Sequence, residues 1–201
     1  PIATHENLSV KIDYISIVFD TATAEDVIRH ILCLPTDIFN VYPATVKFKT
    51  YQARWEIGDI YVSGDAKKTE DNPQGLGCYL VMTGRGCDDI FRILDNNGLT
   101  FGDMFGRCER RYGAGNYHFT RLDVAIDDRN ETPFFTIEQI KKKCEKEEFI
   151  ANSEGYHFDE SKFDDFDTAK TVYIGAGKSG LSYRFYDKDK EVCGKYNRTL
   201  D

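Results

Sequence analysis

A tyrosine followed closely by basic side chains is the first feature of this sequence that could do chemistry. Tyr186 shares one face of a predicted strand with Arg184 and is followed by Lys188 and Lys190. A tyrosine hydroxyl is a poor nucleophile at neutral pH, but nearby cations favour the phenolate and stabilise the charge of a phosphoryl-transfer transition state. Its product would be a covalent tyrosyl–phosphate link. Because a tyrosine among basic residues is more often a packing residue, this segment alone does not decide the chemistry.

Two carboxylates lie on one face of another predicted strand, together with Arg121. Asp123 and Asp127 are separated by roughly 13 Å at about 3.3 Å per residue, so a bend or a ligand from a neighbouring strand is needed before both can bind one ion. Asp123 is the stronger candidate for a Mg²⁺ or Mn²⁺ ligand, since an acid in the middle of an apolar strand needs a partner. Asp127 is a helper or a turn residue. The opposite face is predicted to be core and consists of Leu122, Val124 and Ile126.

The charge of the chain argues against a general DNA-coating role. It carries 26 basic and 34 acidic residues, a net charge of -8, whereas phosphate neutralisation drives the affinity of proteins that coat duplex DNA. Arginines nevertheless concentrate between residues 107 and 121, which is compatible with nucleic-acid chemistry at a limited site. The candidate DNA contacts are Arg110, Arg111, Arg121 and Lys190.

Other patterns exclude several classes of protein. The six cysteines include no C-x-x-C pair, which argues against a zinc knuckle or a compact disulfide framework. No apolar run approaches the roughly 18 residues that cross a bilayer, and the first residues do not resemble a secretory signal. We therefore expect a cytoplasmic protein with buried, reduced thiols and no membrane segment.

The elements that would position these residues mix strands and helices without strict alternation. Strands are predicted at 11–19, in a hairpin over 45–63, at 78–83 and 117–127, and in a last hairpin formed by 171–174 and 181–186. Helices are predicted at 24–34, 88–94, 101–111 and 136–148. This order predicts one α+β domain over 1–201, with a mainly antiparallel central sheet and flanking helices.

Glycine-rich and histidine-containing segments add weaker signals. Gly84 and Gly86 lie between a predicted strand and helix, where backbone N–H groups could bind a phosphate, although a plain turn is the better interpretation. The segment 175–180 lacks the order of a phosphate loop, which argues against binding of a nucleoside triphosphate. The four histidines are too dispersed to form a local metal motif.

Five short segments together resemble the trans-acting replication initiation factor family. They are 12–15, 83–87, 121–128, 171–175 with Ser179, and 184–188 with Glu191. This family contains initiators of Gram-positive rolling-circle plasmids and relaxases of some conjugative transposons. The resemblance covers nearly the whole chain, and the order of the segments makes it specific.

The resemblance implies a site-specific single-strand DNA endonuclease and strand transferase that uses a divalent metal. It makes Tyr186 the nucleophile, beside Arg184 and Lys188, and places the metal on the strand of Asp123 and Asp127. The fold should be similar to the five-stranded antiparallel sheet of other rolling-circle (HUH-like) nucleases. Origin DNA in single-stranded or hairpin form, a second copy of the chain and a host helicase are the partners it implies.

The resemblance also predicts one segment that the sequence lacks, and two alternative functions are compatible with the residues. The family leads us to expect a strand with an R-x-E-x-R-like pattern after the tyrosine segment, so we expect a domain truncated at its C-terminus. The alternatives are a non-catalytic DNA-binding regulator of the same fold and a metal-dependent hydrolase that uses water instead of tyrosine.

Overall fold

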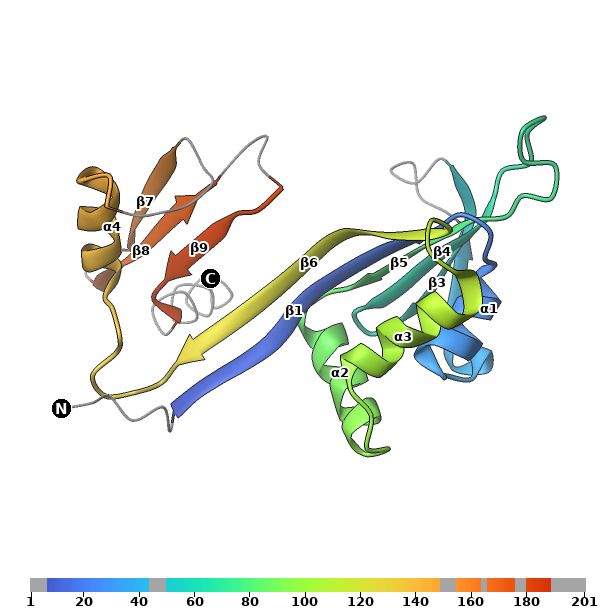
Figure 1. The fold of residues 1–201 in the computed structure, drawn as a ribbon, viewed down its shortest axis with the longest axis horizontal. Helices are drawn as coiled ribbons and strands as arrows, with labels where there is room; N and C mark the ends of the chain where they lie inside the picture. Colours follow the sequence, from blue (N-terminus) through green and yellow to red (C-terminus); the bar gives the residue numbers. More distant parts are fainter. Residues whose placement is uncertain (1–6, 44–49, 149–154, 164–165, 176–179, 189–201) are drawn as a thin grey trace. The chain divides into compact units, whose positions relative to one another are not determined.

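The computed structural model describes residues 7–43, 50–148, 155–163, 166–175 and 180–188 (Figure 1). The chain divides into two compact units: Leu8–Asp127, and Asp128–Asp201 together with Pro1–Asn7. Each unit contains a sheet and a buried apolar core. A single catalytic domain over 1–201 stays a prediction, because two compact units can still act as one functional domain.

The larger unit contains a six-stranded sheet with the strand order β2-β3-β4-β5-β1-β6. Its strands are β1 (Leu8–Phe19), β2 (Asn40–Pro43), β3 (Tyr51–Ile57), β4 (Ile60–Ala66), β5 (Cys78–Met82) and β6 (Tyr117–Asp128). The pairs β1–β5, β2–β3, β3–β4 and β4–β5 are antiparallel. The predicted α+β fold with a mainly antiparallel sheet is therefore confirmed, with six strands in this sheet instead of five.

Three helices pack on one face of the six-stranded sheet: α1 (Ala24–Val27), α2 (Gly84–Asp95) and α3 (Phe101–Tyr112) (Figure 1). Alternate residues of the central strands point toward them and are buried, namely Ile15, Ile17, Phe19, Ile60, Val62, Cys78, Leu80 and Met82. The Phe19 ring lies 5.2 Å from the Tyr112 ring of α3, measured between centroids. This packing supplies the hydrophobic core of the larger unit.

The first helix begins as predicted but does not continue as one regular helix. Thr23 Oγ1 accepts a hydrogen bond from the Asp26 backbone N–H at 3.2 Å, a standard N-cap. After α1 the chain passes into a π-helical turn, Ile28–Leu32, and Cys33 takes a left-handed φ of 56°. The predicted helix over 24–34 is therefore too long, because the wide turn and the left-handed residue end it before Pro35.

The two glycines after β5 form the first turn of α2. We expected these glycines to open the helix predicted at 88–94, and the helix indeed begins at Gly84. A Cβ atom added at Gly86 would lie 2.4 Å from the backbone oxygen of Asp59. The absence of a side chain at Gly86 thus permits close packing of α2 on the β3–β4 turn, which favours a structural role for this glycine.

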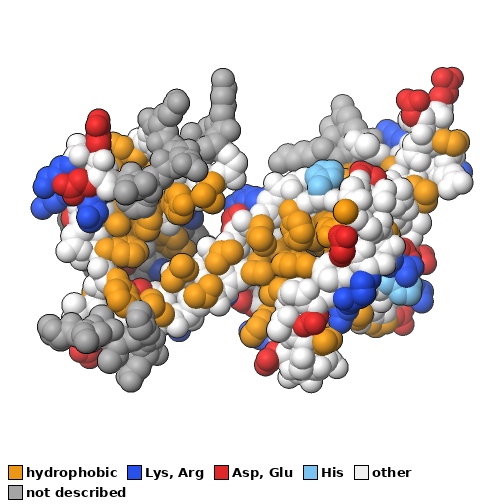
Figure 2. Space-filling view, viewed as in Figure 1, with side chains coloured by type: hydrophobic (Ala, Val, Ile, Leu, Met, Phe, Trp, Pro, Cys, Tyr) orange, Lys and Arg blue, Asp and Glu red, His pale blue; other side chains and the backbone are white. Residues whose placement is uncertain are grey.

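The predicted apolar face of β6 is not part of the core. Leu122, Val124 and Ile126 are 46%, 58% and 67% exposed, and Figure 2 shows hydrophobic side chains at the surface along the long strands of the larger unit. β6 is the edge strand of the sheet, and the described contact with α3 is made near its start, where the Phe119 and Phe105 rings lie 5.0 Å apart. Alternation reveals that a strand has two faces but not which of them is covered.

The smaller unit contains one helix and a three-stranded antiparallel sheet. Its elements are α4 (Ile137–Glu145), β7 (Tyr156–Phe163), β8 (Phe166–Ile174) and β9 (Tyr183–Tyr186), with the strand order β7-β8-β9. A capping box at Thr136 and Gln139 begins α4. The core consists of Ile140, Cys144, Val172 and Ile174. The predicted last hairpin is confirmed by the β8–β9 pairing, whereas β7 lies in an acidic segment that we had not predicted to be a strand.

The described cysteines are all free thiols. Cys78, Cys87, Cys108 and Cys144 are buried and Cys33 is exposed. Burial raises the pKa of the Cys87 thiol to about 12, so this side chain is unreactive. Cys193 lies outside the described residues. In the part of the chain that the structure describes, no helix is long and apolar enough to cross a membrane.

Candidate functional site

The β8–β9 hairpin determines which side chains lie beside Tyr186. Tyr186 is paired with Thr171, and Arg184 with Tyr173, in an antiparallel register. Because side chains alternate along a strand, these four residues share one face of the smaller sheet. Residues of the other face, such as Val172, are buried against α4. Tyr186 is therefore on the face that α4 does not cover.

Arg184 lies against the ring of Tyr186. The guanidinium carbon of Arg184 is 4.4 Å from the Tyr186 ring centroid and 5.7 Å from that of Tyr173. These are cation–π distances, which hold the guanidinium over the tyrosine rings. A fixed positive charge next to a phenol is suited to binding a phosphate and to stabilising charge that develops on it.

The same face carries a histidine–aspartate pair that our sequence reasoning missed. In the register of β7 with β8, His157 is opposite Tyr173 and Asp159 is opposite Thr171. His157 Nε2 lies 2.6 Å from Asp159 Oδ1, and the His157 and Tyr173 rings are 6.3 Å apart. Asp159 therefore lies in the same cross-strand row as Tyr186, with one strand between them, at about 10 Å for two strand spacings. The H-x-D spacing was the available signal, but it has meaning only once β7 is known to be a strand.

The second group of predicted site residues lies in the larger unit. Arg121 donates to both carboxylate oxygens of Asp123, at 2.9 Å from Nε to Oδ1 and 2.6 Å from Nη2 to Oδ2. The guanidinium carbon of Arg121 is also 4.3 Å from the Tyr14 ring centroid. Asp123 raises the pKa of Arg121 through these hydrogen bonds. The predicted metal ligand and the predicted DNA contact thus form a bidentate ion pair with each other.

The acids at the end of β6 differ in their contacts. Asp128 accepts hydrogen bonds from the backbone N–H groups of Asn130 and Phe134, at 3.1 and 2.8 Å. These bonds lower the pKa of Asp128 and give it the role of a turn residue. Asp127 is partly buried on β6, and its role as a metal ligand stays a prediction.

Most arginines of the predicted basic region have structural partners. Arg111 forms an ion pair with Asp26, which also accepts a hydrogen bond from the Tyr112 hydroxyl. Arg107 donates to the backbone oxygen of Ile31 at 3.1 Å. Arg110 is exposed at the end of α3. The DNA-binding roles of Arg110 and Arg111 stay predictions, and the contact of Arg111 provides a structural reason for its presence.

The predicted basic residues after Tyr186 are only partly described. Lys188 is exposed directly after β9. Lys190 and Glu191 lie outside the described residues, so the DNA contact predicted for Lys190 stays a prediction.

No three His, Cys, Asp or Glu side chains within the described ranges are close enough together to hold a metal ion. Mg²⁺ is commonly bound by one or two carboxylates, with water and substrate phosphates completing its coordination. Asp123 and Asp159 have the chemistry for such a site, each within its own unit.

Two family models match consecutive parts of the chain. The rolling-circle replication initiation protein N-terminal domain matches residues 9–107, and the replication initiation factor model matches residues 117–201. Both models describe replication initiation proteins, and together they match most of the chain. The resemblance inferred from the five short segments is thereby confirmed.

Two known proteins show what members of this family look like. The chain is 30% identical over 201 residues to a putative DNA relaxase, NicK, of Bacillus subtilis, covering 99% of this chain and 53% of the relative. It thus spans about half the length of that relative. A solved rolling-circle replication initiator protein from Geobacillus stearothermophilus has the same fold, with a TM-score of 0.71 and 22% identity over 92% of this chain and 69% of the other.

Proposed function

We propose that this chain is the nicking part of a rolling-circle replication initiator or relaxase, and that Tyr186 is its nucleophile. The observation that carries the proposal is the position of Tyr186 on the face of the smaller sheet that α4 does not cover, with the Arg184 guanidinium carbon 4.4 Å from the centre of its ring. Similarity to replication initiation proteins supports the substrate class, a DNA strand at an origin.

In the proposed reaction, the Tyr186 hydroxyl oxygen attacks the phosphorus of one phosphodiester in single-stranded DNA. A bond forms between the phenolic oxygen and phosphorus while the bond from phosphorus to the 3′ oxygen breaks. The phenolic proton is lost to solvent or a base, and the departing 3′ oxygen takes up a proton, so the products are a 5′-phosphotyrosine and a free 3′-hydroxyl. A free 3′-hydroxyl is the end that a DNA polymerase can extend.

The remaining residues on this face would bind and orient the DNA. Arg184 would pair with the scissile phosphate, and Lys188 would add positive charge on the same side of the chain. A Mg²⁺ or Mn²⁺ ion, if held by the Asp159 carboxylate on this face, would polarise that phosphate. Asp123 and Asp127 stay the metal ligands that the sequence predicts within the larger unit. The cytoplasmic location predicted from the sequence remains a prediction. A second copy of the chain and a host helicase remain predictions of the family resemblance.

The test is a nicking assay on a supercoiled origin plasmid and on the matching single-stranded oligonucleotide, with Mn²⁺. The parent chain should form a covalent protein–DNA adduct, and Tyr186→Phe should reduce adduct formation at least a hundredfold, because only the hydroxyl is lost. Tyr183→Phe, on the same strand, is the matched control and should form the adduct at the parental rate.

Three outcomes would contradict the proposal in different ways. Adduct formation by Tyr186→Phe would assign the nucleophile to another residue. Cleavage by the parent with 5′-phosphate ends and no adduct would indicate a hydrolase that uses water. Origin binding without cleavage would indicate a regulator of the same fold.

A further inference from the structure

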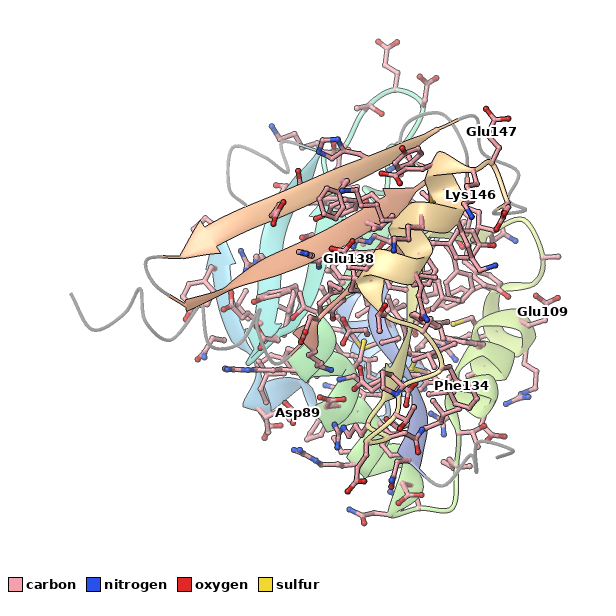
Figure 3. All side chains as sticks on the ribbon, turned by 90° about the vertical axis from the view of Figure 1, so that its left-hand side faces the viewer. Asp89, Glu109, Phe134, Glu138, Lys146 and Glu147 are labelled. Carbon is pink, nitrogen blue, oxygen red and sulfur yellow. The ribbon has the colours of Figure 1, made fainter. Side chains whose placement is uncertain are left out.

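A pocket in the smaller unit combines lysines with exposed aromatic rings. Its volume is about 310 Å³, and its lining includes Phe134, Phe135, Lys142, Lys143, Lys146 and Glu148. These residues come from the segment before α4, from α4 itself and from the segment after it, so the pocket runs along the length of the helix. Figure 3 shows Phe134 in the segment that leads into α4 and Lys146 at the other end of the helix.

The lining of the pocket contains more lysines than carboxylates. Of its three lysines, Lys143 faces Glu148 at 3.9 Å. Among the described residues, Lys142 and Lys146 have no ion-pair partner. Cations near a helix C-terminus offset about half an elementary charge of the helix dipole. Among the lining residues, three lysines stand against one carboxylate, that of Glu148. Lys170 and, less strongly, Lys142 lie close enough to Glu138 to lower the pKa of that carboxyl.

Another lysine on the same helix shows the contrast. Lys141 lies 4.1 Å from the Phe158 ring centroid and 4.0 Å from a Glu145 oxygen, so its charge is used within the fold. It does not line the pocket. Of the lysines of α4, Lys141 thus makes contacts within the fold, whereas Lys142 and Lys143 line the pocket.

The aromatic part of the pocket is held in place by contacts of its own. Phe134 and Phe135 are 45% and 42% exposed. The Phe135 ring packs edge-on against Phe185, with centroids 5.4 Å apart and an interplanar angle of 83°. The backbone N–H of Phe134 donates to Asp128 at 2.8 Å. Rings that stay exposed although their backbone or edge is fixed are suited to stacking on a planar ligand.

We propose that this pocket binds the single-stranded DNA substrate at nucleotides next to the cleaved bond. The bases would stack on Phe134 and Phe135, and the phosphates would pair with Lys142 and Lys146. A pocket of about 310 Å³ suits a nucleotide-sized group. Rings combined with cations are the general means of binding single strands without sequence preference. This inference rests on the proposed function, because it assumes that the chain acts on DNA.

The position of the pocket relative to Tyr186 supports a single continuous strand of DNA. Phe185 faces the pocket side of β9 through Phe135, and Tyr186, the next residue, faces the other side. β9 is the edge strand of the three-stranded sheet. DNA that passes this edge can contact the pocket with one part and Tyr186 with another.

The test measures binding of the full chain to a fluorescent 12-nucleotide oligo-dT in EDTA, so that no cleavage occurs. Lys142→Gln combined with Lys146→Gln should weaken the affinity about tenfold and reduce the salt slope by about 1.4, since each lost phosphate contact is worth about 0.7 on single strands. Phe134→Ala should weaken the affinity by about tenfold without changing the salt slope, because stacking releases no counterions. Lys141→Gln is the matched control and should bind like the parent.

Two results would overturn the proposal. One is that the variant carrying both Lys142→Gln and Lys146→Gln binds oligo-dT with the same affinity and the same salt slope as the control, Lys141→Gln. The other is an equal loss of affinity for a 12-base-pair duplex, which would indicate a general basic surface without single-strand stacking. Failure of the proposed function would instead appear in the adduct assay with Tyr186→Phe, so the two failures are distinguishable.

Discussion

The side chains around Tyr186 indicate how a single tyrosine could be directed at a phosphate. Arg184 contacts the ring of Tyr186, and His157 and Asp159 lie on the same face of the sheet on β7, with β8 between them and Tyr186. A positive charge, a proton acceptor and a carboxylate are thereby collected on one surface of a three-stranded sheet. The carboxylate matters most for a metal, because hard oxygen ligands are what Mg²⁺ and Mn²⁺ prefer.

The metal ligands can be identified by titrating Mn²⁺ in the adduct assay. Asp123→Asn and Asp159→Asn should each raise the Mn²⁺ concentration for half-maximal adduct formation at least tenfold if that carboxylate is a ligand. Asp89→Asn removes a surface acid that pairs with Arg92 and should leave the requirement unchanged. An unchanged requirement in Asp123→Asn would contradict the sequence-based assignment of that residue. Direct Mn²⁺ binding measured on the same variants provides a second readout.

At the scale of elements, α1 and α3 are joined by a polar cluster at Asp26. Arg111 and Tyr112 at the end of α3 both donate to the Asp26 carboxylate, which also lies 3.7 Å from His30. The hydrogen bond from Arg111 is the largest reason why the pKa of Asp26 is lowered. Burial and the Asp26 charge raise the pKa of Tyr112. This cluster explains an arginine that the sequence alone had suggested as a DNA contact.

Asp26→Asn should therefore destabilise the larger unit by on the order of 1 kcal/mol at pH 7. The lowered pKa means that the stabilisation is fully present above the ordinary value of 3.8 and is lost as the pH falls through the lowered pKa. Denaturant unfolding at pH 7 and below pH 3 measures this directly. The parent and the variant should differ at pH 7 and converge in acid, and a difference that persists in acid would contradict the assignment.

At the scale of the whole molecule, the two units have separate hydrophobic cores. The core of the smaller unit consists of Ile140, Cys144, Val172 and Ile174. Phe185, on the strand that carries Tyr186, is partly buried against this core. The larger unit has a much more extensive core, built on β1, β4, β5 and the three helices.

Ile174→Ala is predicted to cost about 2–5 kcal/mol in the smaller unit, because Ile174 is 4% exposed and its removal leaves a cavity. Amide hydrogen exchange should show lost protection in β7, β8 and β9 while β1 and β5 stay protected. Val10→Ala, at a side chain that is 69% exposed, is the control and should leave both units unchanged. Equal loss of protection in both units would mean that they unfold together.

Local patterns determined much of this protein. The alternation of β1, the capping residues Thr23 and Thr136 and the hairpin before Tyr186 act over a few neighbouring residues, so they can be recognised without a fold. The face shared by Arg184 and Tyr186 follows from the period of a strand. The five ordered segments were sufficient to recognise the family resemblance, because each is a short run of neighbouring residues that can be read without knowing the fold.

Only the tertiary structure decided which faces are covered and which distant side chains meet. Leu122, Val124 and Ile126 have the alternation of a core strand, yet they are exposed, because the described contact of β6 with α3 is made by Phe119 on the other face of the strand. His157 and Asp159 come near Tyr186 through the β7–β8–β9 register, which no local pattern in an acidic segment reveals. Arg111 contacts Asp26 from a helix far along the chain. Burial and long-range pairing depend on how elements pack, so they are properties of the folded chain as a whole.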